Sequence, residues 1–242
     1  SILYRIGSTV STSTTSFQIS AEGETTIEVW SIDRAGRVSA IATAVARVDT
    51  GAPVGTMRIS GGATYSTGRT VSVESTVTGA TEMAIDSGAG YGPWIAYQAS
   101  VPVTFTADGY RTLAVRYRDA ADNRLTLTAS ITVDTAAPQF TSVSVTVDSW
   151  RRPKHPTGSL TARWTAVDAN PVTGYSWTVD QNAAGMPDTL ADTAGTMLAT
   201  TVPTHGIWYF HLRARDAAGN WSATRTVRFE VTYGRTRGRV FR

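Results

Sequence analysis

The amino-acid sequence predicts an all-β fold, and three observations lead to that prediction. β-Branched residues are abundant, since threonine alone contributes 39 of the 242 residues, and such side chains suit the pleated, half-buried surface of a strand. Short runs of alternating apolar and polar residues recur along the chain, separated by Gly, Pro, Asp and Asn. One pattern of strand and turn also occurs three times. No amphipathic helix of ten residues or more is expected.

Four runs show the alternation most clearly, and each predicts a strand with one face turned inward. They comprise residues 25–30, 69–74, 112–117 and 142–147. Many short strands with turn residues between them are typical of β-sandwiches.

An aspartate turn follows the strand in every copy of the repeat. These turns begin at Asp33, Asp119 and Asp216, which are 86 and 97 residues apart. The positions six and four before each aspartate are apolar: Ile27 and Val29, Leu113 and Val115, Phe210 and Leu212. After the first two copies comes a further strand and then Val-Asp-Thr-x-Ala-Pro, at residues 48–53 and 133–138. A period of 85–97 residues is the size of one immunoglobulin-like sandwich. We therefore expect tandem immunoglobulin-like β-sandwiches, arranged as beads on a string.

Proline cannot continue a central strand, so each Val-Asp-Thr-x-Ala-Pro segment marks a domain junction. We expect a partial immunoglobulin-like domain at 1–52, an immunoglobulin-like domain at 53–137, an immunoglobulin-like or fibronectin-III-like domain at 138–234 and a basic tail at 235–242. Residues 1–52 make only half a sandwich, which leaves a hydrophobic face and bare strand edges. Its first strands are either missing from this sequence, the explanation we favour, or supplied in trans by another chain through β-augmentation.

The repeated strand, aspartate turn and Val-Asp-Thr-x-Ala-Pro ending resemble the bacterial immunoglobulin-like modules of secreted and surface proteins. Residues 4–6, 17–23 and 31–36 are similar to the OmpL47-type module; residues 83–119 resemble a related bacterial repeat; residues 174–180 and 208–222 resemble the fibronectin-III/Ig-like repeats of secreted actinobacterial proteins. The turn departs from the family pattern at Arg37, where Asn is expected, and at Asp122, where Gly is expected. Modules of this kind act as spacers, adhesins and phage-tail decorations.

Composition excludes several classes of protein. The formal net charge is +3 and arginines are scattered except at the C-terminus, which indicates a solvated surface and no nucleic-acid partner. The chain has no cysteine, so disulfides, Cys-ligated zinc and thiol catalysis are excluded. No apolar stretch approaches the roughly 18 residues of a membrane-spanning helix.

No catalytic constellation is visible in the sequence. A Gly-x-Ser-x-Gly elbow before a helix and a phosphate-binding glycine loop are both missing. The three histidines are His155, His205 and His211, and we expect them to be surface or packing residues. His211 alternates with Phe210 and Leu212, so it is expected to face outward. We therefore expect no enzyme and, calcium aside, no cofactor.

Calcium is the one metal that the sequence suggests. Most aspartates lie at turns, where a carboxylate usually accepts hydrogen bonds from its own backbone. A domain junction could nevertheless bring an aspartate of the linker near one of the neighbouring domain, and Ca²⁺ requires six to eight oxygen ligands. The candidate ligands are Asp49, Asp119, Asp134 and Asp216. The family resemblance allows this, because some related repeats bind calcium at such linkers.

Tyr91, Trp94 and Tyr97 cluster in a segment rich in Gly and Pro. Exposed aromatic side chains on a loop can stack on sugar rings or anchor a protein partner, and the alternative is ordinary packing in the sandwich core. Trp164 and Trp177 are expected in the core of the third domain.

The function expected from the sequence is a non-catalytic structural or spacer module of an extracellular bacterial surface or secreted protein, or of a phage virion, in its tail or as a decoration. Its partners would be the other domains of a longer parent chain or assembly. The alternative is an adhesion or recognition module that binds cell-surface polysaccharide or protein through its loop aromatics. Either function implies an extracellular, cell-surface or virion location.

Overall fold

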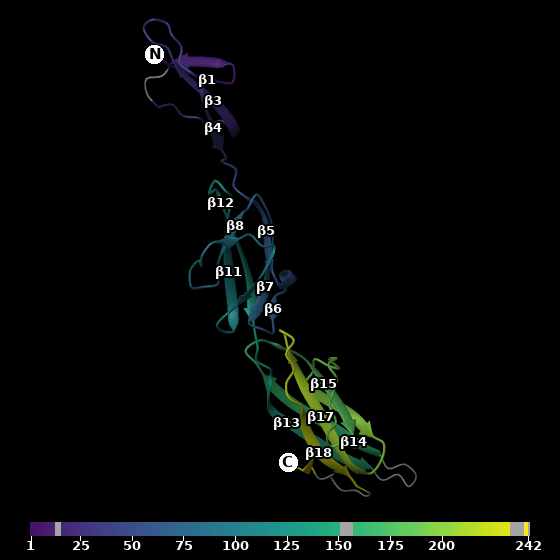
Figure 1. Ribbon diagram of the computed structural model, residues 1–242. Coiled ribbons are helices and arrows are strands. Elements are labelled where there is room, and N and C mark those ends of the chain that lie inside the picture. Colours follow the sequence, from purple (N-terminus) through teal and green to yellow (C-terminus); the bar gives the residue numbers. More distant parts are fainter. Residues whose placement is uncertain (13–15, 151–156, 233–239, 242) are drawn as a thin grey trace. The chain divides into compact units, whose positions relative to one another are not determined.

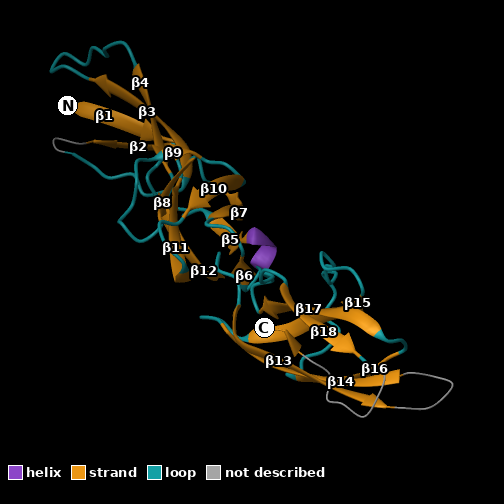
Figure 2. Cartoon of the chain, turned by 90° about the horizontal axis from the view of Figure 1, so that it is seen from below, coloured by secondary structure: helices purple, strands orange, loops and turns teal. Residues whose placement is uncertain are grey.

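The structure, a computed structural model, describes residues 1–12, 16–150, 157–232 and 240–241, and its regular secondary structure is almost entirely β-strand (Figures 1 and 2). Its strands are β1 (Ile2–Ile6), β2 (Thr9–Thr12), β3 (Gly23–Ser31), β4 (Ala42–Val48), β5 (Val54–Ile59), β6 (Tyr65–Ser66), β7 (Thr70–Thr78), β8 (Glu82–Asp86), β9 (Ile95–Ala96), β10 (Ser100–Thr104), β11 (Gly109–Arg118), β12 (Arg124–Val133), β13 (Gln139–Trp150), β14 (Thr157–Val167), β15 (Val172–Asp180), β16 (Met197–Val202), β17 (Gly206–Asp216), β18 (Arg225–Val231) and β19 (Val240–Phe241). One 3₁₀ turn, η1 (Ser60–Gly62), is the helical element of the described chain. The predicted all-β fold is confirmed.

The four alternating runs all lie in strands. Residues 25–30 belong to β3, 112–117 to β11 and 142–147 to β13, while the run 69–74 begins one residue before β7. By its internal contacts the chain divides into two compact units: Ser1–Ile59, Ser72–Val101 and Thr112–Ala129 form the first, and Ser60–Val71, Pro102–Arg111 and Ser130–Arg242 form the second. The division at 52, 137 and 234 remains a sequence prediction.

The strands from β13 to β18 form a sandwich of two antiparallel sheets. One sheet has the order β13-β14-β16 and the other the order β15-β17-β18-β19. The first, second and fourth strands therefore share one sheet, and the third, fifth and sixth share the other. This is the distribution of the immunoglobulin and fibronectin-III folds.

Alternating residues of both sheets meet in the core of this sandwich. Phe210, Leu212 and Ala214 on β17 are fully buried. Trp164 on β14 is buried as well, and its ring lies edge-on to Tyr175 at 5.5 Å between centroids and tilted against Phe210 at 5.9 Å. Trp177 is half-buried and packs against the same core. Period-two alternation thus places the apolar side of each strand inward.

The strands from β5 to β12 repeat this distribution. Their two sheets have the orders β10-β7-β5 and β6-β12-β11-β8-β9. When the two-residue strands β6 and β9 are set aside, the first, second and fourth strands are β5, β7 and β10, and they share one sheet. The third, fifth and sixth strands, β8, β11 and β12, share the other. Leu113, Val115 and Tyr117 on β11 are fully buried. The prediction of tandem immunoglobulin-like sandwiches is confirmed by this recurrence.

The N-terminal strands form a single sheet of order β2-β1-β3-β4. Its register matches that of the sheet containing β17: Gly23 pairs with Val48 as Gly206 pairs with Val231. β1 therefore corresponds to β15, β3 to β17 and β4 to β18. None of the described residues among positions 1–50 is buried. The expected basic tail at 235–242 lies outside the described residues apart from the short strand β19, and His155 also lies outside them.

Candidate functional site

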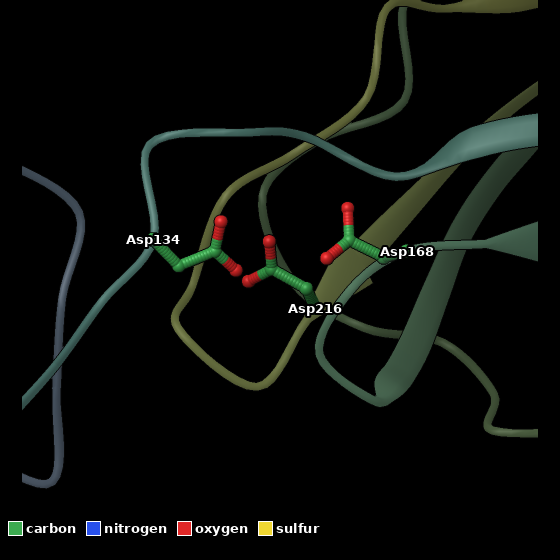
Figure 3. A group of neighbouring side chains, drawn as sticks. All are labelled: Asp134, Asp168 and Asp216. Carbon is green, nitrogen blue, oxygen red and sulfur yellow. The ribbon is translucent and has the colours of Figure 1, made fainter. Parts of the chain in front are cut away.

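Three aspartates of the second unit bring their carboxylates together. Asp134, Asp168 and Asp216 each offer an oxygen, and these oxygens lie within 4.8 Å of one another. Figure 3 shows the three side chains pointing toward one another from separate segments of the chain. Asp134 and Asp216 are almost completely buried, with exposed fractions of 2% and 1%. This aspartate cluster is the strongest candidate metal centre among the described residues.

Each aspartate occupies the end of a strand, where a turn begins. Asp134 directly follows β12, Asp168 directly follows β14, and Asp216 is the last residue of β17. An aspartate at such a position accepts hydrogen bonds from backbone amides one to four residues ahead, which closes the turn. The cluster therefore forms where the linker after β12 meets the ends of β14 and β17.

The hydrogen bonds that the cluster accepts come from amides, which carry no formal charge. Asp134 accepts one from the backbone of Ala136 at 3.1 Å and one from Nδ2 of Asn170 at 2.7 Å. Asp216 accepts from the backbone of residues 219 and 220 at 2.7 and 2.9 Å and from Nδ2 of Asn220 at 2.9 Å. Amide donors stabilise each carboxylate separately, whereas a bound cation would offset the mutual repulsion of three neighbouring negative charges. Hard oxygen donors of this kind suit Ca²⁺.

The sequence-predicted calcium ligands are brought together only in part. Asp134 and Asp216 lie in the cluster, and Asp168, which is not among the predicted ligands, is its third member. Asp49 accepts a hydrogen bond from the backbone of Gly51 at 3.1 Å. Asp119 closes its own turn, and neither it nor Asp49 belongs to a group of three possible ligands in the described chain.

Asp119 shows what the turn aspartate does outside the aspartate cluster. Burial acts to raise its pKa, but hydrogen bonds from the side chain and backbone of Asn123 and from the backbone of Ala121 outweigh burial, so the pKa lies below its ordinary value. The carboxylate is thus held in its charged form by its own turn.

The three aromatic residues of the predicted site lie in two kinds of environment: Tyr97 is hydrogen-bonded within the fold, whereas Tyr91 and Trp94 lie beside arginines. The hydroxyl of Tyr97 donates to the carbonyl of Ser75 at 3.0 Å and accepts from the backbone amide of Val77 at 3.1 Å. Both hydrogen-bonding roles of that hydroxyl are therefore used inside the fold. Tyr97 also lies edge-on to the buried Tyr117, with ring centroids 6.1 Å apart.

Tyr91 and Trp94 are half-buried and lie under arginines. The guanidinium of Arg116 lies 3.9 Å from the ring centroid of Tyr91. Arg118 and Arg124 lie 4.3 and 5.7 Å from the ring centroid of Trp94. Cation–π contacts of this kind cover part of each ring. All three aromatic side chains of the predicted site, Tyr91, Trp94 and Tyr97, are half-buried.

His211 does not face outward, and this expectation is corrected. The residue is completely buried. Its Nδ1 is 2.9 Å from Oγ1 of Thr226, and its Nε2 is 2.9 Å from the carbonyl oxygen of Asn182. The strand alternation does direct His211 to the face opposite Phe210, but the segment after β15 covers that face. A Cβ at Gly185 would lie only 2.5 Å from Nε2 of His211, so this covering segment requires a glycine there.

Comparisons with known proteins found similarity to this chain among solved structures. No protein-family model matches it, and no curated protein matches it. Among solved structures, it is similar to fibronectin(III)-like modules of Clostridium thermocellum CbhA, with 15% identity, a TM-score of 0.41 and coverage of 74% of this chain and 95% of that one. It is also similar to carbohydrate-binding modules of a β-sandwich superfamily, with 11% identity, a TM-score of 0.31 and coverage of 79% and 90%. These values are too low to transfer binding or activity. No helix in the described residues has the length and apolar character to cross a membrane.

Proposed function

We propose that the chain is a non-catalytic structural module, a spacer built from immunoglobulin-like sandwiches. The observation that supports this most strongly is the use of the repeat's polar residues. In every copy the first carboxylate oxygen of the turn aspartate accepts two backbone hydrogen bonds from its own turn, at Asp33, Asp119 and Asp216. The turn aspartates, which are the repeat's most obvious candidates for catalysis or ligand binding, therefore use their carboxylates to maintain the fold.

The setting we propose is an extracellular bacterial surface protein, a secreted protein or a phage virion. The resemblance of the repeat to bacterial immunoglobulin-like modules supports this setting. Such a module would connect other domains of a longer parent chain or assembly.

A binding and activity screen tests the spacer function. The intact chain would be tested against peptidoglycan, isolated cell-wall polysaccharides and a glycan array, together with a panel of glycoside and ester substrates. A spacer gives neither saturable binding nor turnover. Turnover above the buffer rate, or saturable binding to one surface, would contradict the proposal.

Recognition of a cell-surface polysaccharide or protein is the second candidate function. The observation that favours it is the stacking of Arg116 on Tyr91 and of Arg118 on Trp94, since arginine beside an aromatic ring suits acidic sugars. Trp94→Ala would then abolish binding in the screen without lowering the melting temperature by more than a few degrees. Tyr97→Phe is the matched control, because its hydroxyl bonds within the fold.

We further propose that the aspartate cluster binds Ca²⁺ and thereby stabilises the spacer. Two buried carboxylates with a third nearby support this, because burial makes unneutralised charge costly. At free calcium ten times the Kd, binding would stabilise the folded state by about 1.4 kcal/mol. The melting temperature in calcium would therefore exceed that in EDTA by several degrees.

Asp168→Asn tests the calcium proposal, with Asp148→Asn as its control, since Asp148 is an exposed aspartate of β13. The calcium-induced rise should disappear in the first variant and persist in the second. Equal melting temperatures of the unaltered chain in EDTA and in millimolar calcium would rule the site out.

A further inference from the structure

The two Val-Asp-Thr-x-Ala-Pro linkers, residues 48–53 and 133–138, are hydrogen-bonded to side chains that both precede and follow them in sequence. We propose that each linker is a clamped joint, held by an acidic side chain on one side and by an asparagine side chain on the other, and therefore does not act as a free hinge. This inference deepens the proposed spacer function, because it specifies how the spacer is stiffened.

The acidic side of the clamp lies just before a strand of the preceding sheet. The carboxylate of Glu22, immediately before β3, accepts hydrogen bonds from the backbone amide of Thr50 at 3.1 and 3.2 Å and from its hydroxyl at 2.8 Å. Asp108, immediately before β11, accepts from the backbone amide of Thr135 at 3.0 Å and from its hydroxyl at 2.7 Å. Hydrogen bonds to an ionised acceptor are stronger than neutral ones. The threonine of each linker is thus held by both of its donors.

The asparagine side of the clamp lies in the aspartate turn of the following copy. Nδ2 of Asn123 donates to the backbone carbonyl of Asp49 at 2.9 Å. Nδ2 of Asn220 donates to the backbone carbonyl of Asp134, also at 2.9 Å. Each asparagine also donates to the aspartate that opens its own turn, at 2.9 Å in both copies. Both amide hydrogens are therefore used, and the linker carbonyl is joined to an ordered turn.

Residues within each linker also restrict its backbone conformation. The carboxylates of Asp49 and Asp134 accept hydrogen bonds from the backbone two residues ahead, each at 3.1 Å. The prolines that end the linkers, Pro53 and Pro138, have a fixed φ. A flexible linker of six residues would have none of these restraints.

The distribution of these residues over the three copies agrees with a role at the linkers. The acidic residue is present in the two copies that lead into a linker, while the third copy has His205 at that place. The asparagine is present in the two copies whose turns contact a linker carbonyl, at Asn123 and Asn220.

Backbone ¹⁵N relaxation on the intact chain tests the clamp. The amides of Thr50 and Thr135 should have order parameters of about 0.85, the value of rigid backbone, and values below about 0.6 at both would overturn the proposal. Asp108→Ala should lower the value at Thr135 toward about 0.6 and leave Thr50 unchanged. Glu22→Ala should do the reverse, so each joint serves as the control of the other.

Asn220→Ala should loosen Thr135 in the same way, and Asp148→Ala should change neither joint. If Asp108→Ala does not fold, Thr135→Val removes only the hydroxyl donor and should still lower the order parameter. An unchanged value at Thr135 in a folded Asp108→Ala variant would contradict the clamp. The binding screen tests the spacer function separately from the clamp. Saturable glycan binding together with rigid linkers would overturn the spacer function and support the clamp. Mobile linkers without any binding would overturn the clamp and leave the spacer function standing.

Discussion

Three equivalent strands lie in the same order in the N-terminal sheet and in the sheet containing β17, but they are buried to different extents. Ile27 and Val29 on β3 occupy the positions of Phe210 and Leu212 on β17, six and four residues before the turn aspartate. Phe210 and Leu212 are completely buried under the β13-β14-β16 sheet, whereas Ile27 and Val29 are only half-buried. Comparing the two regions therefore shows how much of a side chain's burial comes from its own sheet and how much comes from a second sheet packed over it.

The apolar face of the N-terminal sheet shows this difference residue by residue. Tyr4, Ile6 and Val29 share that face, and Phe17 stacks on Tyr4 with ring centroids 4.3 Å apart. Ile2, at the end of the same face, is 54% exposed. The charged residues lie on the opposite face, where Arg5 pairs with Glu28. Alternation and cross-strand pairing thus suffice to form the sheet, while deep burial requires a second layer.

The largest expected effect concerns the equivalent core positions. Phe210→Ala should destabilise its sandwich by about 3–5 kcal/mol, because it leaves a cavity in a closed core. Ile27→Ala, at the equivalent position, should cost less than about 1 kcal/mol, since its side chain remains in contact with water. Urea unfolding of each variant, followed by residue-resolved NMR, measures both values. Equal losses would mean that the N-terminal face is covered in solution.

A second comparison concerns the outer faces of the same two strands, where His211 and Glu28 are equivalent. His211→Ala should cost about 1–3 kcal/mol, because Thr226 and the carbonyl of Asn182 lose their partner in a buried setting. Glu28→Ala removes a surface ion pair with Arg5 and should cost about 0–1 kcal/mol. Thermal unfolding with two-state analysis gives the difference, and a His211→Ala variant as stable as Glu28→Ala would show that the covering segment is not closed.

The pH dependence compares Glu22 and Asp108, the two acidic residues that accept hydrogen bonds from the linker threonines. A hydrogen bond from Arg69, followed by those from the hydroxyl and backbone of Thr135, lowers the pKa of Asp108 from 3.8 to about 2. Because the folded-state pKa is depressed, the contribution of this carboxylate to stability is complete above about pH 4 and is lost as the pH falls through about 2. Hydrogen bonds from the hydroxyl and backbone of Thr50 also lower the pKa of Glu22 from 4.5.

A ¹³C-carboxyl NMR titration between about pH 1.5 and 6 measures these pKa values. Arg69→Ala should raise the midpoint of Asp108 and leave that of Glu22 unchanged. A midpoint of Asp108 near 3.8 in the unaltered chain would show that its hydrogen bonds do not persist in solution.

The smallest expected effect concerns the turn of the second copy. Asp122 has φ of +68°, in the left-handed region where the other copies have Gly36 and Gly219, with φ of +81° and +104°. Asp122→Gly should relieve the backbone strain but lose the ion pairs with Arg118 and Arg124, so stability should change by less than about 1 kcal/mol. Chemical denaturation measures this change, and a loss above about 2 kcal/mol would mean that the ion pairs do more than surface pairs usually do.

Much of the fold could be predicted from the sequence because alternation and turn residues act locally. The strand around Ile27, the turn at Asp119 and the buried Trp164 all follow from patterns a few residues long. His211 could not be placed from such a pattern, since its burial depends on a segment about 29 residues earlier that folds over the outer face. Alternation assigns a side chain to a face of the sheet but does not reveal what covers that face.

The candidate metal site was predictable in part for the same reason. Asp134 and Asp216 belong to repeated motifs, whereas Asp168 belongs to a single turn after β14 and joins them only through the arrangement of strand ends. The Asp168-Ala-Asn170 sequence is itself a turn signal, and Asn170 donates both to Asp168 and to Asp134. The spacing alone could not show that this turn meets the second linker.

Residue-resolved amide hydrogen exchange of the intact chain tests the central comparison most directly. Amides in the middle of β17, at Phe210 and Leu212, should exchange only through global unfolding of their sandwich, while those of Ile27 and Val29 on β3 should exchange at least about tenfold faster through local opening. Equal protection of the two strands would contradict the account, because it would mean that a second layer covers the N-terminal sheet.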